Sequence, residues 1–157
     1  MTKTTDKRRL RLLAYNVRSL WNVGSFFRTC DGFGVEKLYL TGYTGHPPRK
    51  EITKTAIGAE EFVAWEHHPD PLPVIQALKA EGFSIVSLEL TPNAVPLLTF
   101  TDVPDDVCLV VGHELEGVPK AILDLSAAVV EIPMHGQKES LNVAVAAGIA
   151  LHHLRSA

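Results

Sequence analysis

The chain has 157 residues, of which 46% are hydrophobic and 21% are charged, a composition typical of one globular domain with a substantial apolar core. The longest apolar run, about nine residues, is too short to cross a bilayer, and the basic start MTKTTDKRRLRLL lacks the apolar segment of a signal peptide. We therefore expect a cytoplasmic protein whose two cysteines, Cys30 and Cys108, are reduced core thiols rather than a disulfide.

Apolar spacing and turn residues predict strands that alternate with helices. In chain order, we expect a strand at Arg8–Tyr15, a helix at Asn22–Phe33, a strand at Glu36–Thr41, a loop at Thr41–Lys50, a short helix at Glu51–Gly58, a strand at Glu61–Trp65, a helix at Pro73–Ala80, strands at Phe83–Leu90 and Val107–Val111, a short helix at Pro119–Leu125, a strand at Ala128–Ile132 and a helix at Ser140–Leu154. This alternation favours a three-layer α/β domain with a mainly parallel sheet. Ligands of such sheets bind beyond the carboxyl ends of the strands, so the loops there form the candidate site.

Charge is distributed unevenly along the chain. Residues 1–54 contain 11 Lys and Arg against 4 Asp and Glu, a balance of +7, whereas residues 55–157 contain 4 against 14, a balance of −10. The basic first third suits either a polyanion such as RNA or the acidic part of a second copy of the chain, and charge alone does not distinguish them.

The segment NVRSLWNVGSFFR, Asn16 to Arg28, follows the first predicted strand. Asn22 is either the cap of the next helix or a residue that contacts a ligand. Arg28 lies near Phe27 and Cys30, where a buried guanidinium would need an anionic partner. The alternative for Arg28 is an ordinary exposed helix residue.

A second polar loop, GHELEGVP, follows the apolar strand VCLVV. Gly112 lets a ligand approach the backbone closely, and Glu114 is either a site carboxylate or an ordinary loop charge. The loop contains no Gly-Lys-Ser/Thr, so a phosphate-binding P-loop is unsupported.

The third loop, IPMHGQKESLN, leads into the last predicted helix. Ser140 is a natural cap for this helix, but capping does not explain Asn142, a poor helix former beside an apolar segment. The helix itself is apolar on all sides and rich in small residues, so it must be covered by the sheet or by a second subunit.

Taken together, these loops resemble the three motifs of the SpoU (TrmH-like) RNA 2′-O-methyltransferases of the SPOUT superfamily. The matching segments are N-x-R-S-x-x-N-V-G-S-x-x-R, L-V-V-G-H-E-x-x-G-V and I-P-M-x-G-x-x-x-S-L-N-V, in the family's order. The resemblance implies one methyltransferase domain over residues 1–157, without a separate RNA-binding domain, and a C-terminal deep trefoil knot in the α/β fold.

The resemblance also implies a homodimer that binds S-adenosylmethionine and methylates a ribose of a tRNA or rRNA. By position, it places the cofactor against Gly112, Glu114, Ile132, Met134 and Leu141. It assigns Asn22 and Arg28 to the catalytic pair, with Ser140 and Asn142 beside the cofactor, and we expect all four to serve catalysis. The first motif of one subunit is expected to lie near the cofactor of the other.

Methyl transfer from a sulfonium to a ribose hydroxyl is an in-line displacement that requires a positioned hydroxyl and removal of its proton. A free guanidinium is a very weak acid, so we prefer an electrostatic role in which Arg28 binds the neighbouring phosphate and stabilises the developing alkoxide. Asn22, Ser140 and Asn142 then orient Arg28, the cofactor or the hydroxyl.

Two other functions remain as alternatives at this point. A hydrolase that uses Ser140 and His135 would lack the G-x-S-x-G elbow, and a non-catalytic RNA-binding protein of the same fold would not need both Asn22 and Arg28. The histidines, which include two adjacent pairs, lack the spacing of metal ligands, so we expect no metal.

Overall fold

The computed structural model describes residues 8–157; part of the basic start used to exclude a signal peptide, residues 1–7, lies outside the described residues. Within that range, seven strands form one sheet in the order β3-β2-β1-β6-β4-β7-β5, and every neighbouring pair is parallel. The strands are β1 (Arg9–Tyr15), β2 (Lys37–Thr41), β3 (Trp65–His68), β4 (Ser84–Leu88), β5 (Val95–Pro96), β6 (Asp106–Val111) and β7 (Ala128–Glu131).

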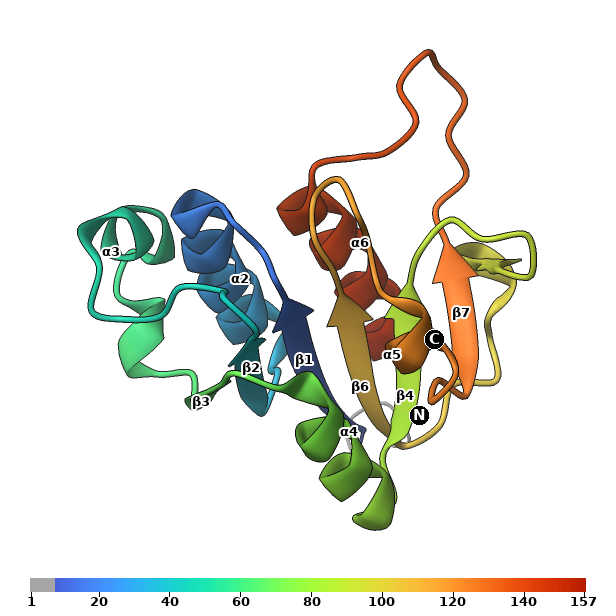
Figure 1. Cartoon of the computed structure of the whole chain (residues 1–157), viewed down its shortest axis with the longest axis horizontal. Coiled ribbons are helices and arrows are strands. Elements are labelled where there is room, and N and C mark those ends of the chain that lie inside the picture. Colours follow the sequence, from blue (N-terminus) through green and yellow to red (C-terminus); the bar gives the residue numbers. More distant parts are fainter. Residues whose placement is uncertain (1–7) are drawn as a thin grey trace.

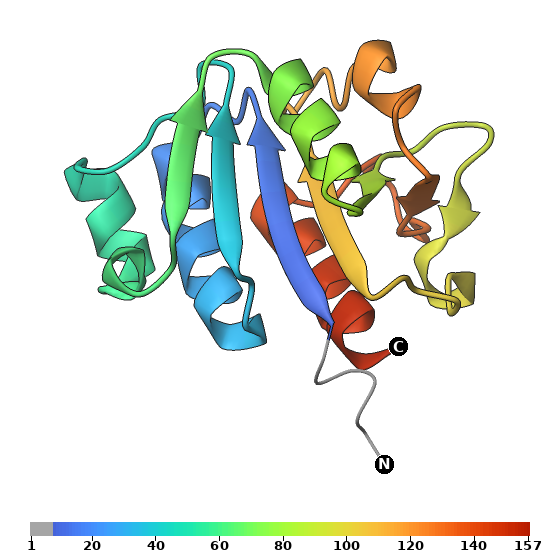
Figure 2. The same cartoon turned by 90° about the horizontal axis from the view of Figure 1, so that it is seen from below.

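Helices cover both faces of this sheet, which confirms the predicted three-layer architecture (Figures 1 and 2). The α-helices are α2 (Leu20–Phe33), α3 (Lys50–Ala56), α4 (Pro71–Ala80), α5 (Lys120–Leu123) and α6 (Val143–Ser156), and two 3-10 helices are η1 (Ala59–Glu61) and η2 (Leu97–Thr99). The helices α2, α3 and α6 lie on one face, and α4 and α5 lie on the other.

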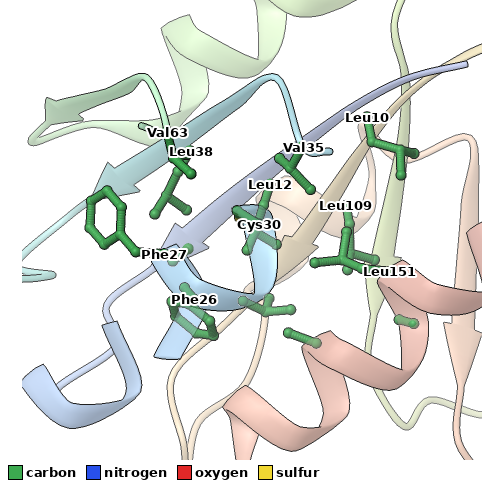
Figure 3. Packing of buried hydrophobic residues seen from close by; sticks show 14 of the residues in the cluster. Leu10, Leu12, Phe26, Phe27, Cys30, Val35, Leu38, Val63, Leu109 and Leu151 are labelled. Carbon is green, nitrogen blue, oxygen red and sulfur yellow. The ribbon is translucent and has the colours of Figure 1, made fainter. Parts of the chain in front are cut away.

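The larger core lies between the sheet and the pair α2 and α6 (Figure 3). Phe26, Phe27 and Cys30 of α2 are fully buried there, together with Leu109 of β6 and Leu151 of α6. Burying an aromatic or leucine side chain stabilises a fold by about 1.5–3 kcal/mol, so this layer dominates the packing of the described chain.

Both cysteines are free and fully buried, as predicted. Burial raises the pKa of the Cys30 thiol and raises the pKa of Cys108 to about 12. Both residues are therefore protonated core thiols at neutral pH, with no catalytic role.

The predicted strand at Glu61–Trp65 is wrong. Residues Ala59–Glu61 form η1, which begins after Gly58 at a φ of 86°, and the strand begins only at Trp65. The sequence of β3, WEHH, is polar because β3 is the edge strand beside β2, so it lacks the apolar run that would reveal it. The short strand β5 at the opposite edge was not predicted at all.

The residues that cap α2 and α6 at their N-termini differ from those that the sequence indicates. The side chain of Ser19 caps α2 by accepting the Asn22 N–H at 3.2 Å, so Asn22 is not the cap. The side chain of Asn142 caps α6, accepting the N–H groups of Ala144 at 2.9 Å and Val145 at 3.2 Å. Ser140 therefore does not cap the last helix, and capping accounts for Asn142 instead.

The strand order places the candidate loops at one edge of the sheet. From β1 the chain moves outward through β2 and β3, and then crosses to the other side of β6 to form β4. The carboxyl ends of β1 and β6 are adjacent at this switch point, and the long loop after β7 projects past the same edge (Figure 1).

Candidate active site

A cleft of about 830 Å³ opens at the carboxyl edge of the sheet, between the loops that follow β4, β6 and β7. Its lining includes seven residues that the sequence singled out: Gly112, Glu114, Ile132, Met134, Ser140, Leu141 and Asn142. The volume lies in the range of small-molecule sites, and the walls combine apolar side chains with a few polar groups, as such sites do.

Glu114 accepts hydrogen bonds from the first loop. Its carboxylate oxygens accept the backbone N–H groups of Arg18 at 3.1 Å and Ser19 at 3.2 Å, and the side-chain amide of Asn22 at 3.3 Å. Partial burial raises the pKa of the Glu114 carboxyl, but these hydrogen bonds outweigh burial, so its pKa lies below the ordinary value. Glu114 is therefore a charged residue that joins the loops after β1 and β6.

Asn22 and Asn142 extend this connection to the third loop. The side-chain amide of Asn142 donates to the Asn22 side-chain oxygen at 3.3 Å, while Asn22 donates to Glu114. The chain Asn142–Asn22–Glu114 thus joins all three polar segments, which are far apart in the sequence. The two amides sit at the starts of α6 and α2, where both helices begin side by side (Figure 1).

Gly112 lines the cleft and also meets a packing requirement. A Cβ at residue 112 would lie 2.4 Å from the backbone oxygen of Gly117, so the loop needs glycine there in order to fold back on itself. The close approach of a ligand to the Gly112 backbone stays a prediction, and this packing is a second reason for glycine at the position. Gly117 also has a φ of 73°, which favours glycine.

Glu89 is a cleft residue that the sequence analysis missed. Its carboxylate accepts the Val118 N–H at 2.7 Å and lies against Gly117, so it supports the loop after β6. Leu88, Leu90 and Thr91 also line the cleft beside it. The signal was present, because Glu89 directly follows β4 and the carboxyl ends of parallel strands share one edge.

Arg28 is the one predicted site residue that the fold keeps away from the cleft. It is exposed on α2 and lines a separate hollow of about 520 Å³, together with Ser25, Thr29, Lys54 and Thr55. Within residues 8–157 its guanidinium has no hydrogen bond or ion pair. The exposed helix residue is therefore the better description of Arg28 in the single chain.

The hydrolase alternative gains no geometric support. Ser140 and His135 are both exposed in the loop between β7 and α6, and no hydrogen bond joins their side chains in the described part of the chain. Among residues 8–157 there is also no group of three or more His, Cys, Asp or Glu side chains placed to hold a metal ion. None of the helices in this range is long and apolar enough to cross a membrane.

Comparison with known proteins relates the segments around this cleft to a known family. Residues 9–152 match the model of the SpoU rRNA Methylase family. The chain is 33% identical to the tRNA (guanosine(18)-2'-O)-methyltransferase of Aquifex aeolicus, over 97% of this chain and 72% of that enzyme. It is 32% identical to the 23S rRNA (guanosine(2553)-2'-O)-methyltransferase of Bacillus subtilis, over 92% of this chain and 57% of that enzyme.

Solved structures agree with these matches. A crystal structure of an AdoMet-bound rRNA methyltransferase from Sinorhizobium meliloti superposes with a TM-score of 0.88 and 26% identity, covering 97% of this chain and 59% of that one. The structure of the Aquifex aeolicus TrmH/SpoU tRNA modifying enzyme gives a TM-score of 0.82 and 32% identity, covering 98% and 78%.

Proposed function

The chain belongs to the SpoU rRNA methylase family, and from this membership we propose that it transfers a methyl group from S-adenosylmethionine to a ribose 2′-hydroxyl of a tRNA or rRNA. The observation that carries the proposal is the hydrogen-bonded chain Asn142–Asn22–Glu114, which joins the three motif segments at one cleft. The activity places the protein with its RNA in the cytoplasm.

The cleft suits a nucleoside cofactor. Apolar side chains of Leu88, Ile132, Met134 and Leu141 offer surfaces for an adenine ring, and the loop backbone of residues 112–117 offers polar groups for its edge. S-adenosylmethionine supplies an electrophilic methyl group when bound. Glu114 keeps the loop after β6 in place through its hydrogen bonds, and Ser140 and Asn142 are polar groups of this chain beside the ligand.

The active enzyme is a homodimer in which Arg28 of one copy serves the cleft of the other. An exposed apolar face supports this assembly: Val145 and Ile149 follow one another along α6, and Trp21 lies at the start of the adjacent helix α2. Arg28 is exposed on α2, remote from the cleft of its own chain. The Arg28 guanidinium that acts at a given cleft is therefore supplied by the second copy.

In that assembly, the planar guanidinium of Arg28 binds the RNA phosphate beside the target ribose and stabilises the alkoxide as the hydroxyl loses its proton. Asn22 and Asn142 orient the reacting groups by fixing the two helix starts. The chemistry thus rests on positioning and electrostatics.

The segment from β7 to α6 forms a deep trefoil knot. Two observations support this threading. β7 pairs with β4 and β5, whereas α6 packs against α2 and β6, so the chain changes neighbours between these two elements. Residues 132–142, which connect them, include residues that line the same cleft as the loop after β6.

The first test is cofactor binding. Titration of the purified chain with S-adenosylhomocysteine in a calorimeter should give one site per chain. A ligand at 100 times its dissociation constant that binds only the folded state should stabilise the fold by about 2.7 kcal/mol, seen as a raised melting temperature. Absence of both heat and thermal shift would contradict the proposal.

The second test is the product. Ribose 2′-O-methylation blocks alkaline cleavage at the next phosphodiester, because the hydroxyl is the attacking group. RNA from a strain that lacks the gene should therefore be cleaved by alkali at one tRNA or rRNA position that is protected in the wild type. Cofactor binding without any such position would instead favour a non-catalytic RNA-binding protein.

A further inference from the structure

A second polar surface borders the cleft, where the loops after β1, β2 and β6 meet. The ring of Tyr43 is exposed, with 56% of its surface accessible, and lies edge-on to the His113 ring at 6.3 Å between centroids. A hollow of about 390 Å³ adjoins it, lined by Arg18, Ser19, His113, Glu114 and Leu115. Because His113 and Glu114 line both the hollow and the cleft, the two surfaces are continuous.

The backbone of Tyr43 is held firmly although its ring faces solvent. Its N–H donates to the Asn16 side-chain oxygen at 3.0 Å, and Asn16 itself has a φ of 53°, a left-handed conformation that few non-glycine residues adopt. A Cβ on Gly42 would lie 1.9 Å from that same oxygen. The next residue, Thr44, is buried, and its hydroxyl accepts the Val17 N–H at 3.0 Å.

His113 is oriented by its own loop. Its Nδ1 accepts the N–H groups of Leu115 at 3.0 Å and Glu116 at 2.9 Å. A neutral ring that accepts at Nδ1 carries its proton on Nε2, which leaves an N–H donor as the remaining polar group of the ring. The His113 ring is therefore oriented by its loop and presents one N–H donor beside the Tyr43 ring.

Arg18 adds an unpaired cation to this surface. Its side chain is exposed, and within residues 8–157 its guanidinium has no hydrogen bond or ion pair, although its backbone N–H holds Glu114. Arg18 and His113 line the same hollow, and the Tyr43 ring lies against the His113 ring, so the three side chains border one surface. Glu114 lines the same hollow, but its oxygens bind the backbone of Arg18 and Ser19 and the amide of Asn22, and within residues 8–157 no ion pair joins it to the Arg18 guanidinium.

From these contacts we propose that Tyr43 and Arg18 form a docking site for one nucleotide of the RNA substrate, with the base stacked on Tyr43 and the phosphate bound by Arg18. The proposal rests on the proposed function, because it concerns the RNA that enters the same cleft. Exposed aromatic rings beside cations are how proteins bind unpaired bases, since every base has a face that stacks. The rigid backbone keeps the ring in place without the substrate, which lowers the cost of ordering it on binding.

The direct test uses two fluorescent probes that differ only in their bases: a ten-nucleotide oligo(A) RNA and the same RNA with abasic residues. Tyr43→Ala should weaken binding of oligo(A) by roughly 5- to 150-fold, the effect of losing one base–aromatic stack, and leave the abasic probe unchanged. Tyr43→Trp should retain the affinity. Arg18→Ala should weaken both probes and reduce the salt dependence of binding by about one phosphate contact.

The matched control is Phe62→Ala, because Phe62 is 81% exposed and lines none of the three hollows described above. It should bind both probes like the wild type. Melting temperatures of all variants should agree within a few degrees, since both rings are on the surface. Equal affinity of wild type and Tyr43→Ala for oligo(A) would overturn the proposal, as would equal weakening of both probes.

Kinetic measurements distinguish a failure of the docking site from a failure of the methyltransferase function. With the RNA position found by alkaline mapping as substrate, Tyr43→Ala should raise KM for RNA and leave the dissociation constant of S-adenosylhomocysteine unchanged. Wild-type KM in Tyr43→Ala would refute the docking site while leaving the methyltransferase intact. Base-dependent oligo(A) binding through Tyr43 in a chain without methyltransferase activity would refute the enzyme instead.

Discussion

At the scale of single residues, Glu114 shows how one side chain joins two distant loops. Its carboxylate accepts three hydrogen bonds from residues 18–22, which lie more than 90 positions earlier in the chain. Because backbone donors favour the charged carboxylate, the pKa of Glu114 lies below its ordinary value despite partial burial. A pKa lowered by folding is also a contribution to stability.

Glu114→Gln should therefore destabilise the fold in a pH-dependent way. The contribution of the charged carboxylate is fully present above the ordinary Glu pKa of about 4.3 and is lost as the pH falls through the lower pKa of the folded state. At pH 7 we expect a loss of about 1 kcal/mol in the free energy of unfolding, and at a pH low enough to protonate the carboxyl in the folded state this loss should shrink toward zero. Urea titrations at both pH values measure it.

Glu116→Gln is the control for this measurement, because Glu116 is exposed in the same loop and its carboxylate makes no hydrogen bond within the described residues. It should match the wild type at both pH values. An equal difference between wild type and Glu114→Gln at pH 7 and at the acidic pH would show that shape rather than charge matters at this position.

Arg28 tests the catalytic assignment at the same scale. Because Arg28 lies outside the cleft of its own chain, Arg28→Ala should leave the dissociation constant of S-adenosylhomocysteine nearly unchanged. It should lower turnover by about two to three orders of magnitude, as loss of an oxyanion donor does. Arg28→Lys should restore only part of the rate, since an ammonium lacks the planar fork. Single-turnover methylation rates and calorimetry provide both quantities.

Arg49→Ala removes another exposed arginine from the basic first third and should keep wild-type turnover. If Arg28→Ala methylates RNA at the wild-type rate, Arg28 has no catalytic role. If it loses activity only because the cofactor no longer binds, its role lies in the cleft rather than on the RNA.

At the scale of elements, the start of α6 combines two functions in Asn142. The side-chain oxygen caps the helix, and the side-chain amide reaches Asn22 across the cleft edge. Ser140, which looks like the cap in the sequence, lies two residues before Asn142, in the exposed loop. The start of α6 is thereby joined to the start of α2 by a hydrogen bond.

Substitutions at Asn142 should separate these two functions. Asn142→Ala removes cap and amide together, so it should cost about 0.5–2 kcal/mol in unfolding free energy and weaken S-adenosylhomocysteine binding. Asn142→Ser keeps a cap oxygen but not the amide, so stability should largely recover while the affinity stays low. Urea denaturation and calorimetry measure the two effects.

Ser140→Ala should leave unfolding free energy unchanged, because Ser140 caps nothing in the structure. A loss of stability in Ser140→Ala comparable with that in Asn142→Ala would mean that the helix begins earlier than the structure places it. Unchanged cofactor affinity in Asn142→Ser would mean that the amide contact with Asn22 is dispensable.

At the scale of the whole molecule, the exposed apolar residues of α2 and α6 form the proposed interface between two copies. Val145, Ile149 and Trp21 are each more than two-fifths exposed, although they lie next to the main core. The uneven charge, +7 in residues 1–54 and −10 in the rest, allows the two parts of different copies to attract one another. The apolar face rather than the charge should dominate, because burial of such area is insensitive to salt.

The wild-type chain should therefore have the mass of a dimer of 17.2 kDa subunits by light scattering, even at about 0.5 M salt, where the Debye length is only a few Å. Ile149→Asp should shift the mass toward that of the monomer, because it places an unpaired charge in the apolar face. Leu98→Asp is the control: Leu98 is 79% exposed on η2 and is not part of the apolar face formed by Trp21, Val145 and Ile149. A monomeric wild type, or a dimeric Ile149→Asp, would exclude this face as the interface.

Much of the fold could be predicted from the sequence, because strand and helix periodicity are local properties. The apolar run VCLVV and the helix before Gly34 were recognisable, and both appear as β6 and α2. The edge strand β3 escaped prediction, since a strand with one neighbour needs no apolar run.

The candidate site divides in the same way. The residue types of the three polar loops and their places after strands by themselves predicted a candidate site at one edge of the sheet, and seven predicted residues do line one cleft. Only the tertiary structure decided that Asn142 rather than Ser140 caps α6, that Glu89 joins the cleft, and that Arg28 faces away from it. These outcomes depend on strand order and on which helix faces meet. Both are set by packing between segments that lie far apart in the sequence, such as Leu10 and Leu154 in the same core, and no local pattern reveals them.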